Sequence, residues 1–532
     1  MGTRLFRRDY EYAKILPLLQ STIDTLREQS RQKDEEIKRL RQIILNLQRA
    51  QFGQRSEKRT YILDDGTRQL SMFDTPEKPE EAPAPELPQN PEKEIRVSGH
   101  SRKKKRTLEE LCATLPVEER IVDLPDDEKA NAHGHALVCI GQEYIRTELV
   151  LERAKAKVVK HYRKVYADRE LEQATGYSEV FKPVMPPPLL AHSYASASVV
   201  ADVLMKKYVD AMPLYRQEQM WKRMGVELKR GTMANWVIQV ADLYLRPFWK
   251  RIRSELLTQS TIHADETVMQ VHKEKDRPDT SESRMWVYSS AKRASIQLRC
   301  FEYRESRSGK WAKDFLEGFH GVLITDGYSG YNKVEDAEHA GCWAHMRRKW
   351  LEAIPEGADA KTCNAAQGYE FCNRLFELER QFEKLTAKER LMQRKEKSSP
   401  VLEAYWTWLN TISRPTGKLK DAVTYAQNQK AHLCAFLEHG EIEISNNQVE
   451  NAIRPFVIGR KGWLFADTPQ GAEASAIIYS LMETAKANNL RLDDYLLHLL
   501  SILPERAEQS KDFQVDDLLP WSEEMRSWFS AV

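Results

Sequence analysis

Three carboxylates in this 532-residue chain occur in an order typical of metal-dependent phosphoryl transfer. Asp265 and Asp326 each close a short apolar run that predicts a strand, in TIHADETVMQV and GVLITDGYSGY, and Glu450 follows much later in ISNNQVENAIRP. Cutting or joining a nucleic-acid backbone can use two divalent ions about 3.5–4 Å apart, which activate the attacking oxygen and stabilise the leaving oxygen. Carboxylate oxygens suit Mg²⁺ or Mn²⁺. We therefore expect Asp265, Asp326 and Glu450 to be catalytic and to hold two such ions.

The residue after the first aspartate is also acidic. Asp265 and Glu266 are adjacent, so the alternation of a strand sends them to opposite faces and only one can join the site. We choose Asp265, because Asp265 and Asp326 both follow an apolar run and neighbouring strands would bring them together. The alternative is that these aspartates only cap loops.

The elements that must position these carboxylates follow the order of a ribonuclease-H-like fold. The patterns predict a strand ending at Asp265, strands in RMWVYSSA and ASIQLRCFEY, a helix in SGKWAKDFLEGF, strands in GVLITDGY and AEHAGCWAH, and a helix in MRRKWLEAI. Such an order forms a mixed sheet with helices on its faces. A helical insertion at about residues 363–439 interrupts this core, with an apolar stripe at Leu375, Leu378, Phe382 and Leu385.

Glu450 is predicted on a short helix. Ser445 and Gln448 form an S-x-x-Q capping box at its start, and Pro455 should end it. Arg454 lies one turn after Glu450 and could hold it or contact a phosphate, although a simple surface ion pair is the alternative. Three apolar residues form the predicted buried stripe: Val449, Ile453 and Phe456.

Basic residues near the predicted site are candidates to support the carboxylates or to contact DNA. They are His345, Arg347, Arg348, Arg454, Arg460 and Lys461. For the first three, a packed histidine and a solvated basic turn are the alternatives. The formal net charge of the chain is only +2, so any binding of nucleic acid must depend on local clusters of basic residues.

A helix-turn-helix is predicted upstream of the core. LYRQEQMWKRMG forms a first helix with Leu214, Met220 and Met224 available for packing, Gly225 supplies the turn, and Thr232 could cap a second helix in TMANWVIQVADLY. Four residues of this region would face outward and are of types that reach phosphates and base edges: Arg230, Thr232, Asn235 and Gln239. A helical hairpin that binds no DNA is the alternative.

The N-terminal third of the chain has different patterns. Apolar residues spaced three and four apart, from Leu16 to Leu47, predict a coiled coil and self-association, and a Pro-rich linker follows. Alternating residues after Leu108 predict short strands. This segment contains His133, His135, Cys139 and His161, but a zinc site wants four ligands, usually in close pairs, and only one thiol is nearby. We expect no zinc there.

The composition predicts a soluble intracellular protein. The chain is 41% hydrophobic and 30% charged, and its seven cysteines are scattered without a C-x-x-C pair, which favours reduced thiols. No apolar run approaches the roughly 18–20 residues that span a bilayer, and the start has no signal-peptide pattern.

Several strings resemble the transposases of the insertion sequence 66 family. They are HADET, ITDGYSGY, GCWAHMRRKW, ISNNQVENAIRP, GRKGWLFADTPQGAEASAIIYSLMETAK, FGQRSEK and KYVDAMPLYRQEQ, and they span nearly the whole chain. The resemblance implies a DDE transposase of a bacterial mobile element, in which Asp265, Asp326 and Glu450 match the catalytic positions. It also implies a zinc-finger-like module, a small C-terminal domain and, often, two small accessory proteins. Where members usually carry paired cysteines in that module, this chain has EKANAHGHALVCIGQEY.

The sequence therefore predicts a multidomain α+β protein. Its segments are a coiled-coil helix (1–60), a Pro-rich basic linker (61–107), a β-rich zinc-finger-like module (108–172), a helical helix-turn-helix region (190–255), a ribonuclease-H-like catalytic core (256–484) and a small helical C-terminal domain (485–532). We expect a homo-oligomeric, cytoplasmic DNA transposase, nucleoid-associated when bound to double-stranded DNA at element ends and target, with no membrane partner. The alternatives are a non-catalytic DNA-binding protein derived from a transposase and a related nuclease without strand transfer.

Overall fold

The computed structural model describes residues 156–164, 166–167, 180–181, 184–355, 363–510 and 512–531. The predicted coiled coil, the linker and most of the β-rich module lie outside the described residues. The chain divides into two units, residues 1–149 and 150–532, and all described residues belong to the second. Two short strands near its start, β1 (Tyr166–Ala167) and β2 (Val180–Phe181), pair in antiparallel fashion.

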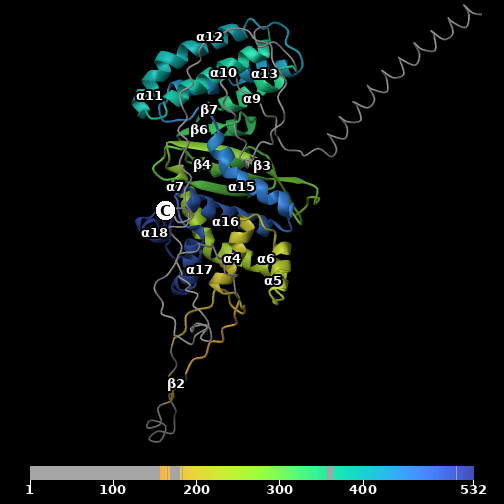
Figure 1. Cartoon of the computed structure of the whole chain (residues 1–532), viewed down its shortest axis with the longest axis vertical. Coiled ribbons are helices and arrows are strands. Elements are labelled where there is room, and N and C mark those ends of the chain that lie inside the picture. Colours follow the sequence, from red (N-terminus) through yellow and green to blue (C-terminus); the bar gives the residue numbers. More distant parts are fainter. Residues whose placement is uncertain are drawn as a thin grey trace, which may run out of the picture. The chain divides into compact units, whose positions relative to one another are not determined.

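A six-stranded mixed sheet lies at the centre of this unit (Figure 1). The strands β3 (Thr261–Val271), β4 (Glu282–Ser290) and β5 (Arg299–Arg304) are antiparallel, while β6 (Val322–Thr325) and β7 (Glu338–Gly341) continue in parallel on the other side of β3. The order is β5-β4-β3-β6-β7, and β8 (Phe465–Ala466) pairs with the end of β3. The predicted mixed sheet is confirmed.

Helices cover both faces of the sheet, which is why β4 and β6 are runs of buried residues rather than alternating ones. On one face, α7 (Arg246–Leu257) and α8 (Lys310–Phe315) pack with Ile252, Trp286 and Phe315 in one core. On the other face, α15 (Asn447–Trp463) contacts β3 and β4.

The outer edge of β5 is closed by side chains of α16 (Pro469–Ala487). The backbone N–H of Phe301 donates to the Ser480 hydroxyl at 2.7 Å, and that of Arg299 donates to the Thr484 hydroxyl at 3.0 Å. The Thr484 hydroxyl also donates to the Arg299 carbonyl at 3.0 Å. These bonds satisfy backbone groups that an open sheet edge would leave unpaired.

One hydrophobic core joins the region before the sheet to the end of the chain. It contains residues of α4 (Ala197–Tyr208), α5 (Leu214–Arg223), α6 (Arg230–Val240), α15, α16 and α17 (Leu492–Gln509), and α18 (Glu523–Phe529) also contributes. A π-helical turn at Ala241–Leu245 links α6 to α7. The helical region at residues 190–255 and the C-terminal segment, which the sequence suggests are separate, thus share their packing.

The helical insertion has its own core, formed with α9 (Trp343–Ala353). Its helices are α10 (Asn364–Gln381), α11 (Ala387–Gln393), α12 (Ser399–Leu409), α13 (Gly417–Asn428) and α14 (Lys430–Cys434), with a π-helical turn at Arg394–Ser398. They lie beside α9, β6 and β7 in Figure 1. Of the predicted stripe, Leu375 and Phe382 are buried, whereas Leu378 and Leu385 are partly exposed.

Several predicted boundaries are wrong. Asp265 is the fifth residue of the eleven-residue β3 and does not end it, because β3 continues past the shorter β6 to pair with β4 and β8. The strand predicted through His345 stops at Gly341, and α9 begins at Trp343. His345 therefore lies in the first turn of a helix.

The helix that carries Glu450 also differs from the prediction. α15 begins at Asn447 with Asn446 as its N-cap and no side-chain capping bond, so the predicted capping box does not form. Pro455 lies inside the helix, which continues to Trp463. Pro455 cannot donate to the carbonyl of Asn451, but Asn451 is exposed, so water can satisfy that carbonyl. The predicted buried stripe is confirmed, since Val449, Ile453 and Phe456 are all buried.

No helix among the described residues is long and apolar enough to cross a membrane. The five cysteines of the described part of the chain are free.

Candidate active site

The pairing of β3 with β6 brings the two predicted catalytic aspartates to the same place in the sheet. The last paired position joins His263 to Ile324. Two residues further along each strand are Asp265, still within β3, and Asp326, directly after β6. Because residues two apart share a face of a strand, both carboxylates lie on the sheet face that α15 covers.

Two hydrogen bonds hold Asp326 in the loop after β6. Its carboxylate oxygen Oδ1 accepts a hydrogen bond from the N–H of Tyr328 at 2.9 Å. Gly327 between them has φ +91°, a conformation that a side chain would strain, and a Cβ there would lie 2.9 Å from the Gln429 side chain. The carbonyl of Asp326 accepts a hydrogen bond from the hydroxyl of Tyr425 in α13 at 2.7 Å. The helical insertion therefore helps to hold the second aspartate.

The electrostatic surroundings show that the three predicted carboxylates lie close enough to interact. Burial raises the pKa of Asp265 well above its usual range. Three neighbouring carboxylates raise this pKa further, in the order Glu266, Asp326 and Glu450. A site that concentrates this much negative charge favours either a proton or a cation.

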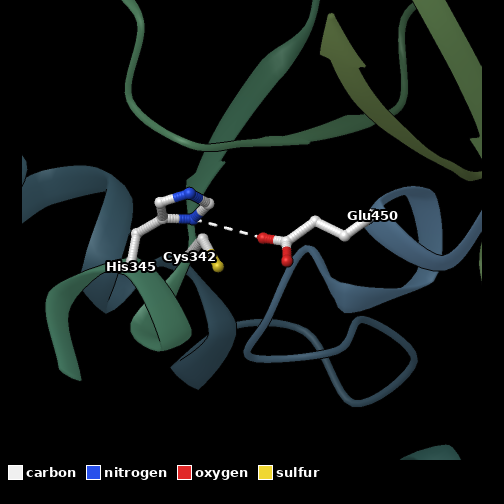
Figure 2. A group of neighbouring side chains, drawn as sticks. All are labelled: Cys342, His345 and Glu450. Atoms are coloured by element: carbon white, nitrogen blue, oxygen red, sulfur yellow. Dashed lines mark ion pairs between the residues drawn. The ribbon is translucent and has the colours of Figure 1, made fainter. Parts of the chain in front are cut away.

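Glu450 faces the start of α9, as Figure 2 shows. Its Oε1 lies 3.6 Å from Nδ1 of His345, and its Oε2 lies 3.6 Å from Nη2 of Arg348. Burial lowers the pKa of His345, which favours the neutral ring. Both His345 Nδ1 and Glu450 Oε1 are buried and make no hydrogen bond. Cys342 completes this group, because the ligand atoms of Cys342, His345 and Glu450 all lie within 4.8 Å of one another.

Asn446 connects the elements that carry the site residues. Its Oδ1 lies 3.0 Å from Nδ1 of His263 on β3, and its Nδ2 donates to the carbonyl of Ala264 at 2.8 Å. Its backbone N–H donates to the sulfur of Cys342, just before α9, at 3.1 Å. Asn446 is fully buried and directly precedes α15. The position of Glu450 relative to Asp265 and His345 therefore depends on this residue.

Glu266 occupies a different environment from Asp265, in agreement with the predicted alternation. Its cross-strand partner Trp286 belongs to the core on the α7 side of the sheet. The Glu266 carboxylate accepts a hydrogen bond from the Tyr331 hydroxyl at 2.7 Å and pairs with Arg307, whose Nη2 lies at 2.5 Å. The guanidinium of Arg307 also lies 4.0 Å from the ring centroid of Tyr328. The Glu266 carboxylate is thus already bound by Tyr331 and Arg307.

The remaining basic candidates lie on α9 and α15. Arg347 turns toward the insertion, where its Nε donates to the side chain of Asn373 at 2.6 Å. Arg460 donates to the Thr267 hydroxyl on β3 at 3.2 Å. Lys461 is exposed near the end of α15, and Arg454 is partly buried one turn after Glu450. Of the predicted basic residues, His345 and Arg348 therefore lie 3.6 Å from the Glu450 carboxylate oxygens.

The helix-turn-helix candidates lie on α6. Arg230, Asn235 and Gln239 are exposed, as predicted, and Thr232 is partly exposed. Thr232 does not cap the helix, because α6 already begins at Arg230, whose N–H donates to the Glu218 carboxylate at 3.1 Å.

The packing of the first helix in this pair also differs from the prediction. Gln217 and Trp221 are the residues of α5 that are buried. Leu214 and Met220 are partly buried, and Met224, which we expected to pack, is 38% exposed.

The donor set suits a hard divalent cation. Asp265, Asp326 and Glu450 offer carboxylate oxygens from β3, the loop after β6 and α15, and Glu450 Oε1 is buried without a hydrogen-bond partner. Burial is the main cause of the raised pKa of Asp265, and a cation would relieve the carboxylate repulsion that raises it further. The three carboxylates therefore offer ligand oxygens for divalent metal ions, and Arg348 places positive charge beside Glu450.

Four residues around the site escape the sequence patterns: His263, Tyr425, Cys342 and Asn446. His263 and Asn446 occur inside the strings HADET and ISNNQ, where an Asn directly before a helix could have indicated an N-cap. Tyr425 comes from the insertion and has no local signal at all.

Comparison with known proteins places this geometry in context. A family model described as "Transposase IS66 family" matches residues 192–474, which include the sheet, the insertion and α15. A second model, "Transposase C of IS166 homeodomain", matches residues 39–120, outside the described residues. The uncharacterized protein y4qI of Sinorhizobium fredii is 29% identical over 510 residues, 92% of this chain and 89% of the relative. The uncharacterized protein y4hP of the same organism is 25% identical over 503 residues, 90% and 87% of the two chains.

Proposed function

Because this chain belongs to the IS66 family of transposases, we propose that it is a DDE transposase that cleaves the ends of a bacterial insertion sequence and joins them to target DNA. The observation that carries this proposal is the convergence of Asp265, Asp326 and Glu450 from three separate elements onto one face of the sheet. The strand order β5-β4-β3-β6-β7, with three antiparallel strands followed by two parallel ones, supports a ribonuclease-H-like core.

The three carboxylates would hold two Mg²⁺ or Mn²⁺ ions. When bound, such ions lower the pKa of a water molecule, stabilise the leaving oxygen and neutralise charge on the transferred phosphate. The chain's own contribution is to fix the ligands. Tyr328 and Tyr425 hold Asp326 and its loop, and Asn446 holds α15 against β3, so these contacts restrict how far the elements that carry the carboxylates can move.

Two successive displacements at phosphorus would follow. In the first, water attacks the phosphodiester at an element end, the bond from phosphorus to the 3′-oxygen breaks, and a 3′-hydroxyl is released. In the second, that hydroxyl attacks a phosphodiester of the target and displaces its 3′-oxygen. Arg348, which lies beside Glu450, is a candidate to contact the phosphates of these strands.

The partners in this proposal are double-stranded DNA at element ends and target, further copies of the chain and two small accessory proteins. The exposed residues of α6 are candidates for DNA contacts: Arg230, Thr232, Asn235 and Gln239. The proposed location is the bacterial cytoplasm, in association with the nucleoid when DNA is bound.

One assay separates this proposal from its alternatives. Purified full-length protein is incubated with Mg²⁺, labelled DNA from the ends of the element that encodes it and an unlabelled target plasmid. A transposase transfers label to the plasmid. Cleaved ends without transfer would indicate a nuclease, and retarded but intact DNA would indicate a binding protein.

A further inference from the structure

Besides the carboxylates, the site contains a cluster whose chemistry differs from that of a magnesium site. Cys342 directly precedes α9, His345 lies in its first turn, and Glu450 faces them from α15 (Figure 2). Sulfur, imidazole nitrogen and carboxylate oxygen together form a donor set that zinc takes readily and magnesium does not. We propose that Cys342, His345 and Glu450 form a binding site for a zinc-like divalent ion, which competes for Glu450 with the ions that the carboxylate site holds.

The spacing of the three donors agrees with such an ion. Ligand atoms about 2.0–2.1 Å from zinc at a tetrahedral angle lie about 3.3–3.4 Å apart, and a sulfur at about 2.3 Å lies about 3.6 Å from a nitrogen ligand. His345 Nδ1 and Glu450 Oε1 are 3.6 Å apart, and all three donors lie within 4.8 Å. Side-chain movements of about 1 Å therefore suffice to bring them to one centre.

Two unsatisfied atoms point to a ligand between them. His345 Nδ1 and Glu450 Oε1 are both buried, face each other and have no hydrogen-bond partner. Buried polar atoms are destabilising when they are left unpaired, and a cation that binds both atoms explains their juxtaposition. Their side chains are 20% and 24% exposed, which leaves a path for an ion from solvent.

The surroundings of the cluster are compatible with a bound cation. Burial raises the pKa of the Cys342 thiol to about 11, and the backbone N–H of Asn446, which donates to the sulfur at 3.1 Å, opposes this effect. A bound cation would replace the thiol proton, which would be released to solvent. Arg348 opposes a second positive charge, but its side chain is 53% exposed and contacts the other oxygen of Glu450, so it can move away.

Occupation of this site would inhibit the enzyme. Glu450 has one carboxylate. If this carboxylate binds the ion held by Cys342 and His345, it turns away from the ions held by Asp265 and Asp326. This consequence rests on the proposed function, whereas binding of the ion to the cluster does not.

Cobalt provides a direct test of binding, because Co²⁺ occupies zinc sites and its bond to a thiolate gives a charge-transfer absorption. Chelator-treated full-length protein is titrated with Co²⁺ and then with Zn²⁺. We expect a charge-transfer band that saturates at one equivalent and is removed by zinc. Cys342→Ser should lose this band and still fold, since serine is a good N-cap. His345→Gln should weaken binding by at least the roughly 10- to 100-fold that loss of a metal-orienting group costs.

Two thiol controls identify the ligand. Cys434→Ser removes a partly buried thiol of α14. Cys139→Ser removes the thiol that is nearest in the sequence to His133 and His135. Both variants should keep the cobalt band. The proposal is overturned if wild-type protein gives no band, or if the band survives in Cys342→Ser.

The inhibition is measured separately, as strand transfer at saturating Mg²⁺ with increasing Zn²⁺. The zinc concentration for half-inhibition should rise roughly 10- to 100-fold in Cys342→Ser, relative to the rate of that variant without zinc. Equal zinc sensitivity in wild type and variant contradicts the competition. If wild-type protein transfers no strands with Mg²⁺ alone, the proposed function fails and the cobalt titration still decides whether the metal site exists.

Discussion

Asp265 and Asp326 occupy adjacent positions across the parallel pair β3 and β6, each two residues beyond the paired His263 and Ile324. β6 ends at this point while β3 continues, so one aspartate is held within a strand and the other in a tight loop. This difference gives Asp265 a partly buried position within a strand and leaves the geometry of Asp326 to the loop and the insertion.

The stability of the metal-free protein should depend on the charge of Asp265. Burial and neighbouring carboxylates raise its pKa, so between about 3.9 and the raised value the folded state binds more protons than the unfolded chain. Stability should therefore fall as pH rises through this window. Asp265→Asn should raise the thermal midpoint of chelator-treated protein at neutral pH and remove the further increase caused by Mg²⁺.

The matched control for this experiment is Asp336→Asn, which neutralises an exposed aspartate and should leave the midpoint unchanged. A lower midpoint for metal-free Asp265→Asn would show that Asp265 is stabilised by its surroundings rather than repelled.

Asn446→Ala should uncouple α15 from β3. The change leaves the buried His263 ring nitrogen and the Ala264 carbonyl without their partner, at a cost of about 1–3 kcal/mol for each group. Denaturant unfolding should show this loss, and strand transfer should fall by more than DNA binding does. Asn451→Ala, on the exposed side of α15, is the control. Equal effects of the two substitutions would show that Asn446 does not couple α15 to β3.

The insertion should influence catalysis through Tyr425. Tyr425→Phe removes the hydrogen bond to the Asp326 carbonyl, at a cost of about 0.5–1.5 kcal/mol, and should lower the strand-transfer rate without changing DNA affinity. Tyr369 lies in the same insertion, and its hydroxyl contacts Arg347 of α9. Tyr369→Phe removes this contact and leaves the Asp326 loop untouched. Rate measurements on both variants should show a clear loss only for Tyr425→Phe. Identical rates for the two would mean that the insertion does not set the position of Asp326.

DNA recognition should depend on α6 rather than on the carboxylates. Arg230→Ala should weaken binding uniformly across sequences and reduce the salt slope by about one, as expected for a lost phosphate contact. Asn235→Ala, if this side chain reaches a base, should cost about 1–3 kcal/mol of sequence discrimination. Fluorescence anisotropy at several salt concentrations measures both effects. Wild-type behaviour of both variants would exclude α6 as the recognition helix.

Much of the core could be predicted from the sequence, because its signals are local. Apolar runs predict the order of the strands, and the spacing of Val449, Ile453 and Phe456 predicts which side of α15 is buried. The alternation of Asp265 and Glu266 likewise predicts that the two face different environments.

The errors arise where distant contacts decide the outcome. The length of β3 depends on pairing with β4 and β8, so a local pattern could not show that Asp265 lies within the strand. The contact of Tyr425 with the Asp326 loop joins residues about a hundred positions apart. α15 begins directly after Asn446, whose side chain bonds to β3 instead of capping the helix, and the capping pattern of Ser445 does not reveal this contact.

The central claim is that Asp265, Asp326 and Glu450 act as one site for strand transfer. Its most direct test compares wild type with Asp265→Asn, Asp326→Asn and Glu450→Gln in the plasmid-joining assay with Mg²⁺, together with DNA binding. Each variant keeps the shape of the side chain but removes one negative charge. We predict that each binds element-end DNA as wild type does and forms no joined product, with no additional loss in the double variants. Joined product at the wild-type rate from Asp326→Asn or Glu450→Gln would contradict the account.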